Sequence, residues 1–291
     1  MAKCAFLGLG VMGYPMAGHL VKKGNHEVTV YNRTFEKAEK WASEFGGKAA
    51  RTPREAADGA EFVMMCVGND DDVRSVALGP TGAVPAMEPG AVLVDHTTAS
   101  ADIARELAAA CVERGLGFVD APVSGGQAGA ENGQLTVMCG ADAPEVFAAA
   151  REIVMAYARE CRRLGGAGAG QTTKMVNQIC IAGMVQGLAE AVAFAQKAGL
   201  DVSEVVATIG KGAAASWQME NRAETMAAGE FEHGFAVEWM RKDLAICLAE
   251  ANRIGARLPV TALVDQFYHH LVERGGSRWD TSSLVQLLQQ P

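Results

Sequence analysis

The fold is decided near the start of the chain, by the stretch Lys3-Cys4-Ala5-Phe6-Leu7-Gly8-Leu9-Gly10-Val11-Met12-Gly13. Its first half, as far as Gly8, has the apolar composition of a short buried strand. A helical pattern then runs from Met12 to Lys23 and stops at Gly24, a residue that often ends helices. We therefore expect a strand that turns through glycines directly into a helix.

Outward from this stretch, strand and helix patterns alternate through the first half of the chain, which indicates a parallel sheet covered on both faces. After the glycine-rich run 165–170 the pattern becomes helical, beginning with a long helix over Gln171–Ala198. The sequence predicts an α/β fold, a Rossmann-type doubly wound sheet followed by an all-helical C-terminal domain. The predicted domains are residues 1–166, which hold the sheet, and residues 167–291, which are helical.

Length and composition agree with this organisation. A chain of 291 residues suits two domains, and 49% apolar with 21% charged residues is an ordinary globular balance that excludes wholesale disorder. Lysine and arginine number 26 against 34 acidic residues, a net charge of −8, and no basic run is present. We therefore expect neither a nucleic-acid partner nor a polybasic membrane anchor.

Cysteine usage indicates a reducing compartment. Seven cysteines cannot all pair internally, and none forms a C-x-x-C motif, so we expect reduced thiols and a cytoplasmic protein. No cluster of ligands suggests a metal site. Glycines interrupt the apolar N-terminal stretch, and no apolar run reaches 18 residues, so we expect neither a secretion signal nor a membrane span.

The turn Gly8-Leu9-Gly10-Val11-Met12-Gly13 matches G-x-G-x-x-G, the pattern of dinucleotide-binding turns. In that role Gly8 allows the tight turn, Gly10 lets the backbone approach a pyrophosphate, and Gly13 lets the helix pack on the strand. The helix N-terminus adds free N–H groups and a positive potential. The alternative is a strand-to-helix turn that binds nothing.

Cofactor preference is predicted from the end of the second expected strand, where Asn32-Arg33-Thr34 stands 19 positions after Gly13. Binding sites for NAD usually carry an acidic residue there, which would repel the 2′-phosphate of NADP. A guanidinium instead binds phosphate in a planar fork. We therefore favour NADP(H), with NAD(H) possible. The alternative is that Arg33 is simply solvated.

Three further loops follow expected strands, at the edge where open parallel sheets bind ligands. Val67-Gly68-Asn69 and Asp95-His96-Thr97-Thr98 offer backbone groups to the ribose and nicotinamide. Asp120-Ala121-Pro122-Val123-Ser124-Gly125-Gly126 ends another strand. Its Ser124 hydroxyl and the N–H groups of Gly125 and Gly126 are suited to a small carboxylate substrate. A plain turn is the alternative.

Lys174 is the candidate catalytic residue, at the start of the long apolar helix. Asn177 and Gln178 follow three and four residues later and share its helical face, where they are candidate substrate-binding residues. An ammonium beside apolar neighbours is costly to desolvate unless it has a task. Interconversion of an alcohol and a carbonyl needs a proton moved at the hydroxyl, and a buried lysine can move it. The alternative is a surface lysine.

Together these motifs resemble the β-hydroxyacid dehydrogenase family, which includes 3-hydroxyisobutyrate dehydrogenases, tartronate semialdehyde reductases and glyoxylate/succinic semialdehyde reductases. Residues 6–17 resemble its cofactor signature, 120–126 its substrate signature and 168–178 its catalytic signature. Lys242-Asp243-Leu244 resembles a fourth segment. Length, motif order and the helical second half agree as well, so the resemblance covers the whole chain.

The resemblance implies that Lys174 is the general acid/base and that Thr98 lies near the nicotinamide. It also implies cofactor contacts from Lys242 and Asp243, and a substrate pocket shaped by Trp217 and Phe235. A homodimer or homotetramer is implied for the assembly. Gln178 departs from the asparagine that many members carry, and its reach differs by one methylene. His19 also replaces an asparagine, and its side chain is given no role.

The expected activity is NADP-dependent hydride transfer between nicotinamide and a small β-hydroxy acid or its semialdehyde. Three alternatives differ from it. An imine reductase shares the two-domain plan but typically lacks the lysine at position 174. A non-catalytic NADPH-binding module has no need of a proton donor. A 6-phosphogluconate dehydrogenase needs a longer helical domain and sugar-phosphate ligands.

Overall fold

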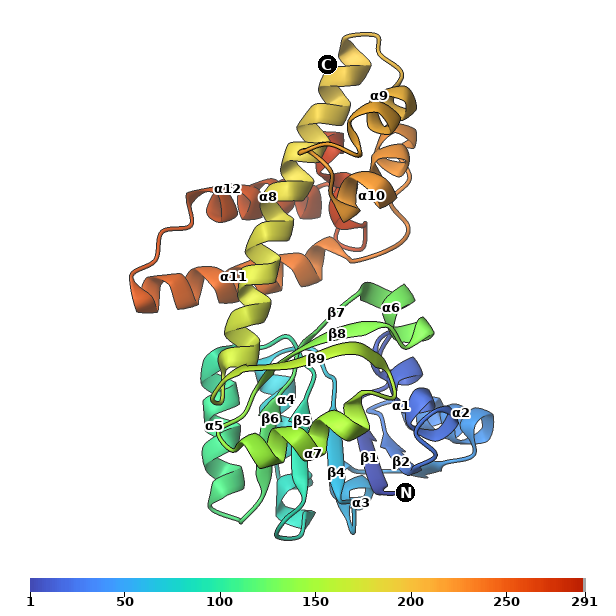
Figure 1. Cartoon of the computed structure of the whole chain (residues 1–291), viewed down its shortest axis with the longest axis vertical. Helices are drawn as coiled ribbons and strands as arrows, with labels where there is room; N and C mark the ends of the chain where they lie inside the picture. The colour runs from blue at the N-terminus through green and yellow to red at the C-terminus, as the bar shows by residue number, and fades with distance from the viewer. Residues whose placement is uncertain (290–291) are drawn as a thin grey trace. The chain divides into compact units, whose positions relative to one another are not determined.

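The computed structural model describes residues 1–289, so the last two residues of the predicted second domain lie outside it. The described chain separates into two compact units, one ending at Lys174 and the other beginning at Met175 (Figure 1). This division falls inside helix α8 (Ala169–Lys197), because the helix starts in the first unit and continues into the second.

The first unit is built on one sheet, which has nine strands within residues 1–289. The strands are β1 (Lys3–Leu7), β2 (Glu27–Tyr31), β3 (Lys48–Ala50), β4 (Phe62–Met65), β5 (Val92–Asp95), β6 (Gly117–Asp120), β7 (Val123–Ser124), β8 (Leu135–Gly140) and β9 (Ala158–Gly165). Their order is β3-β2-β1-β4-β5-β6-β8-β7, and β9 pairs with β8. Strands β1 to β6 run parallel, whereas β8 is antiparallel to β6 and β7.

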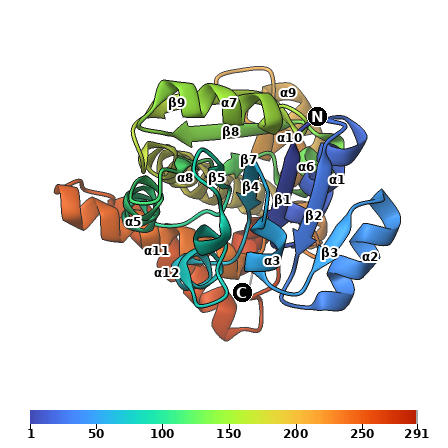
Figure 2. The ribbon, with the colours of Figure 1, turned by 90° about the horizontal axis from the view of Figure 1, so that it is seen from below.

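Helices cover both faces of this sheet, as a doubly wound fold requires (Figure 2). They are α1 (Gly13–Lys22), α2 (Phe35–Phe45), α3 (Pro53–Ala57), α4 (Asp70–Leu78), η1 (Val84–Ala86), α5 (Ala101–Val112), α6 (Gly126–Asn132) and α7 (Pro144–Val154). Side chains of β1 alternate between two cores, because Cys4 and Phe6 pack with α1, α2 and α7 while Ala5 and Leu7 pack with α3, α4 and α5.

The second unit is built from helices joined by loops, with one isolated β-bridge between Ala236 and Asp280 in its described part. It contains the rest of α8 together with α9 (Val202–Ile209), α10 (Trp217–Ala228), α11 (Val237–Ile254), α12 (Pro259–Glu273) and the short η2 (Thr281–Leu287). A single core joins side chains of α8, α10, α11, α12 and η2, including Leu188, Met226, Leu244 and Tyr268. The predicted fold class is therefore confirmed. Asp280 caps η2, since its carboxylate accepts from the Ser282 N–H at 3.0 Å.

The sequence did not predict strand β9. Its residues include three arginines and one glutamate, and most of them are exposed. Within the described chain β9 pairs with β8 alone, so it lies at an edge of the sheet and needs few apolar side chains. Charged residues at an edge strand also discourage pairing with another chain, which explains why an apolar pattern is missing here.

Helix α8 is long and apolar enough to cross a membrane by length and composition alone. Half of its most apolar 18-residue window is buried within the chain. Core helices of soluble proteins pass the same test, and α8 supplies Ala182, Val185, Leu188 and Ala189 to the core of the second unit. Packing thus accounts for part of its apolar character, while Val176, Met184 and Phe194 of the same helix keep exposed surface.

A buried histidine closes the carboxyl end of β5. His96 lies with its Nδ1 2.7 Å from the Ala121 carbonyl oxygen and its Nε2 2.7 Å from the Tyr157 hydroxyl. Because a carbonyl only accepts, Nδ1 carries the proton and the Tyr157 hydroxyl donates to Nε2. Burial lowers the pKa of His96 to about 4.

We predict that His96 weakens the fold in mild acid. Between pH 6.5 and 4 the unfolded chain protonates this histidine while the folded chain does not, so its contribution to stability falls as pH falls, by up to about 3 kcal/mol. Urea unfolding of the wild type and of His96→Gln at several pH values measures the effect. The variant should show the smaller loss toward pH 4.

Two buried carboxylates act in the opposite direction and serve as an internal reference. Burial raises the pKa of Asp95 to about 7 and that of Asp120 to about 6, so both groups favour the folded state as pH falls. They are present in the wild type and in the variant alike. Parallel pH dependences in the two proteins would contradict the assignment to His96.

Candidate active site

The predicted site residues of the first unit gather at the carboxyl edge of the sheet. Strand β1 has β2 on one side and β4 on the other, so the strand order reverses there. Doubly wound sheets bind ligands outside the carboxyl ends of the strands at such a point. The segments after β1, β2, β4, β5 and β6 therefore converge on one region.

The glycine turn has the shape that a dinucleotide needs. Gly8 has φ +98°, and a Cβ there would lie 2.3 Å from the Cys66 carbonyl oxygen. A Cβ on Gly13 would lie 2.0 Å from the Gly8 carbonyl oxygen. Gly10 is exposed, and a Cβ there would meet no atom within 4 Å. Of these three glycines, Gly10 is thus the exposed one, and the open space beside it fits a pyrophosphate.

Asn32 braces this turn from the end of β2. Its Oδ1 accepts from the Leu9 N–H at 3.0 Å, and its Nδ2 donates to the Thr34 carbonyl oxygen at 3.0 Å. The Leu9 side chain is fully buried, whereas Val11 is largely exposed and Met12 half-buried. Asn32 therefore shapes the turn itself, a role that spacing along the sequence did not indicate.

Arg33 projects from the same loop with a side chain that is 89% exposed. Its Nη1 lies 3.7 Å from Oδ1 of Asp72, in the first turn of α4. The sequence did not single out Asp72, because nothing near it in the chain shows that it will lie beside Arg33. The two residues follow different strands, β4 and β2. A carboxylate therefore stands near Arg33 after all, contributed by the first turn of α4.

The loops after β4 and β5 are tied to one another. The Val67 N–H donates to Oγ1 of Thr97 at 3.0 Å, and Asn69 caps α4 by accepting from the Asp72 N–H at 2.9 Å. Gly68 lies under the Asp72 carboxylate, which is 2.5 Å from the position of a Cβ. Thr98 follows directly and is half-buried. These contacts hold the predicted ribose and nicotinamide segments together.

The predicted carboxylate-binding turn is open to solvent. Ser124 ends the two-residue strand β7, and Gly125 and Gly126 follow with φ values of +130° and +60°. Both glycines are exposed, and nothing lies within 4 Å of a Cβ added to Gly126. The turn then enters α6, so its N–H groups lie at a helix start, where an anion is favoured.

Lys174 lies in the second turn of α8, and the start of that helix is fixed to the sheet. The Asp120 carboxylate, at the end of β6, accepts from the Gly168 and Gln171 N–H groups at 2.8 Å each. The Gln171 side chain accepts from the Ala99 N–H at 3.0 Å and donates to the Thr97 carbonyl oxygen at 2.7 Å. Lys174 itself is buried, with 8% of its surface exposed.

In the second unit, Gln178 is held inside a small polar network. Its Nε2 donates to Oδ2 of Asp243 at 2.6 Å, and its Oε1 accepts from Nδ2 of Asn177 at 2.7 Å. Lys242 Nζ lies 3.3 Å from the other carboxylate oxygen of Asp243. The departure from asparagine at position 178 therefore has a structural use, since the longer amide reaches α11.

Trp217 and Phe235 belong to a second cluster in this unit. The Arg222 guanidinium lies 4.9 Å from the centre of the Trp217 ring and 3.2 Å from an Asp280 oxygen. The other Asp280 oxygen accepts from the Phe235 N–H at 2.8 Å. The structure thus links the two predicted pocket aromatics through Arg222 and Asp280, and both rings keep exposed surface.

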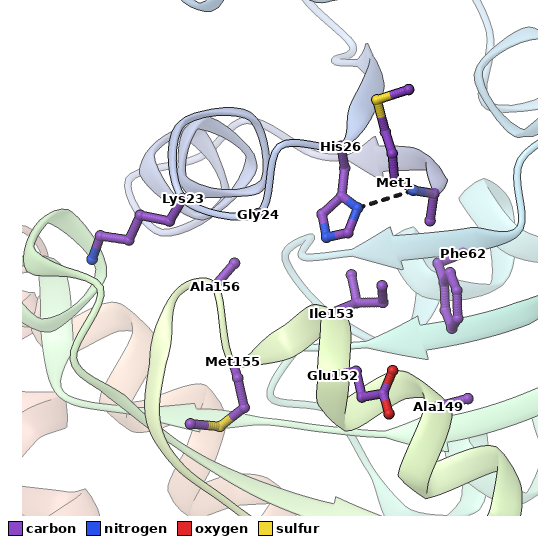
Figure 3. A pocket seen from close by; sticks show the side chains of 11 residues that line it. Met1, Lys23, Gly24, His26, Phe62, Ala149, Glu152, Ile153, Met155 and Ala156 are labelled. Atoms are coloured by element: carbon purple, nitrogen blue, oxygen red, sulfur yellow. Dashed lines mark hydrogen bonds between the residues drawn. The ribbon is translucent and has the colours of Figure 1, made fainter.

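Within residues 1–289 no group of three or more His, Cys, Asp or Glu side chains could hold a metal ion. A cavity of about 630 Å³ lies at the amino-terminal edge of the sheet, lined by Ala2, His26, Phe62 and Glu152 among others (Figure 3). There the Ala2 N–H donates to Nδ1 of His26 at 3.2 Å. Neither the glycine turn nor Lys174 lines it, so it is separate from the predicted site.

The glycine turn, the reversal of strand order and the loops at the carboxyl edge define a dinucleotide-binding protein. Family models divide the chain in the same way. The model of the NAD binding domain of 6-phosphogluconate dehydrogenase matches residues 3–166. The model described as NAD-binding of NADP-dependent 3-hydroxyisobutyrate dehydrogenase matches residues 168–288.

Relatives are similar over the full length. An uncharacterized oxidoreductase of Shewanella frigidimarina is 61% identical, covering 100% of this chain and 99% of its own. The 2-hydroxy-3-oxopropionate reductase of Escherichia coli is 33% identical, covering 99% of this chain and 97% of its own. The structure of Mycobacterium tuberculosis 3-hydroxyisobutyrate dehydrogenase with L-serine is 28% identical, covers 100% of both chains and has a TM-score of 0.90.

The chain belongs to the β-hydroxyacid dehydrogenase family. It is an NAD(P)-dependent oxidoreductase that acts on CH–OH donors.

We predict that two neighbouring glycines fail in different ways. Gly10→Ala should fold normally, because its Cβ meets nothing, yet weaken NADPH binding about tenfold or more by filling the space at the phosphates. Gly13→Ala should lower the melting temperature, because its Cβ would overlap a backbone oxygen. Thermal melts and NADPH fluorescence titrations measure both. Unchanged NADPH affinity in Gly10→Ala would contradict the assignment.

Proposed function

We propose that this enzyme interconverts a small aldehyde acid and the corresponding hydroxy acid, with Lys174 as the group that moves the hydroxyl proton. One observation carries the proposal. Lys174 is buried at the start of α8, and Asp120 and Gln171 fix that start to the ends of β6 and β5. Burying an ammonium is costly, so a lysine held there has a task that outweighs the cost.

A bound nicotinamide supplies the hydride in reduction and accepts it in oxidation. Lys174 donates a proton from Nζ to the developing alkoxide in reduction and takes the hydroxyl proton in oxidation, so charge does not accumulate on the substrate oxygen. The Ser124 hydroxyl and the Gly125 and Gly126 N–H groups hold the substrate carboxylate. This contact orients the substrate, which lowers the entropic cost of reaction.

Support for an aldehyde acid as substrate comes from chemistry and from relatives. The turn at Ser124–Gly126 offers hydrogen-bond donors at a helix start, which suit a carboxylate. The Escherichia coli relative is named for reduction of 2-hydroxy-3-oxopropionate, a small aldehyde acid. We therefore place the substrate among acids of this size.

We also propose a preference for NADP(H). The exposed Arg33 guanidinium stands at the end of β2, and residues 32–34 include no carboxylate. A 2′-phosphate would form charge-assisted hydrogen bonds with it. Asp72 competes for Arg33, but an exposed ion pair at 3.7 Å contributes only about 0–1 kcal/mol, so the phosphate displaces it. NAD(H) remains a usable second cofactor.

Lys174→Ala should lower kcat by about 10²- to 10⁴-fold, because the proton donor is lost, while NADPH binding stays within about twofold. Initial rates with glyoxylate, succinic semialdehyde, methylmalonate semialdehyde and tartronate semialdehyde measure the first effect, and fluorescence titration measures the second. Lys197→Ala changes an exposed lysine of the same helix and is the control. Near-normal turnover by Lys174→Ala would refute the acid/base role.

Arg33→Ala should raise KM for NADPH about tenfold to a hundredfold and leave KM for NADH unchanged, because only the 2′-phosphate loses a partner. Asp72→Asn should lower KM for NADPH about twofold to fivefold, because a nearby negative charge is removed. Asp71→Asn is the control, since that neighbouring carboxylate contacts Arg74 instead. Equal effects on NADPH and NADH would refute the preference.

A further inference from the structure

Helix α1 carries a side chain that the dinucleotide motif does not use. His19 lies in its second half and points away from the glycine turn, toward the end of α6. Its Nε2 lies 3.0 Å from the Ala130 carbonyl oxygen and 3.0 Å from that of Glu131. Both partners only accept, so Nε2 carries the proton and donates to the pair.

Lys23, one helical turn further on, extends the same contact. Its Nζ donates to the Asn132 carbonyl oxygen at 3.3 Å. The last carbonyl groups of any helix lack partners within the helix, and positive or donating groups are favoured there. Helix α1 and its C-terminal cap residue Lys23 thus supply donors to three consecutive carbonyl groups at the end of α6.

Helix α6 depends on such outside contacts for its position. It has seven residues, and Ala130 is its one buried residue among those described. The segment before it, β7, has two residues and is held by pairing with β8. The turn at Ser124–Gly126 therefore lies between an anchor on β8 at its start and an anchor on α1 at the far end of α6.

We propose that His19 is a positioning residue, which holds α6 so that the Ser124–Gly126 turn keeps the geometry needed for a substrate carboxylate. Helix α1 begins at the dinucleotide turn, so the two binding segments share one frame. This inference rests on the proposed function, in which that turn binds the carboxylate. His19 itself touches neither the glycine turn nor Ser124 in the contacts described above.

The test uses His19→Leu, which keeps bulk but removes the donor, and His19→Gln, whose amide offers an N–H at a similar reach. Among the four aldehyde acids of the rate assay above, the substrate is the one that the wild type reduces fastest. His19→Leu should raise KM for this substrate about fivefold to twentyfold, with kcat and NADPH affinity within about twofold of the wild type. Amide hydrogen exchange in residues 126–132 should also become faster. His19→Gln should restore both readouts toward the wild type.

Lys22→Met is the matched control, because Lys22 lies on the same helix but its Nζ is 4.4 Å from the Phe45 ring centre. Unchanged exchange in α6 of His19→Leu would overturn the inference, as would faster exchange with an unchanged substrate KM. Equal loss of substrate and NADPH affinity, without rescue by His19→Gln, would reduce His19 to a general structural role and also overturn it.

Failure of the proposed function would look different. A wild-type protein that binds NADPH but reduces none of the four aldehyde acids would refute the proposed substrate class. The exchange measurement then decides the inference by itself, with glyoxylate as the carboxylate probe in the presence of NADPH. Slower exchange of residues 126–132 on adding glyoxylate, lost in His19→Leu, would support it, and its absence in the wild type would overturn it.

Discussion

One buried carboxylate, that of Asp120, joins the end of β6 to the start of α8. Its two oxygens accept the Gly168 and Gln171 N–H groups, which would otherwise be unpaired donors at the helix start. Two residues beside this carboxylate are glycines, because there is no room for a side chain. A Cβ on Gly140 or Gly170 would lie 2.4 or 2.8 Å from a carboxylate oxygen of Asp120. The position of α8, and with it that of Lys174, follows from this contact.

Gln171 fixes the start of α8 at a second point. Its amide bridges backbone groups of Thr97 and Ala99, in the loop after β5 that also carries Thr98. A second hydrogen bond links this loop to Val67, after β4. The chain of contacts from α8 to the loop after β4 therefore runs through backbone and buried polar groups, which hold their geometry better than exposed ion pairs do.

Much of this was predictable from local sequence. The glycine turn, the alternation of strands and helices and the change to helical pattern near residue 170 depend on neighbours in the chain, and all of them are present in the structure. Lys174 was singled out because an ammonium interrupts an apolar helix. Strand β9 was missed because an edge strand carries charges in place of the apolar pattern that marks a buried one.

Contacts between distant segments could not be read from the sequence. Asp120 was quoted within a motif, yet its partners lie 48 and 51 residues further along the chain. Asp72 approaches Arg33 only because β2 and β4 both flank β1. Gln178 was expected to face a substrate, whereas its amide also binds Asp243, 65 residues away. No spacing rule connects such pairs; only the folded sheet and helix bundle do.

The division of the chain inside α8 has a consequence for how such enzymes diversify. The dinucleotide turn, the Ser124–Gly126 turn and Lys174 all belong to the compact unit that ends at Lys174. Trp217 and Phe235 belong to the other unit, where Arg222 and Asp280 support them. Under the proposed roles, the segments that bind the dinucleotide, hold the carboxylate and move the proton are inherited together in one compact unit. A gene copy that keeps this unit and drifts in its helical half therefore keeps all three segments.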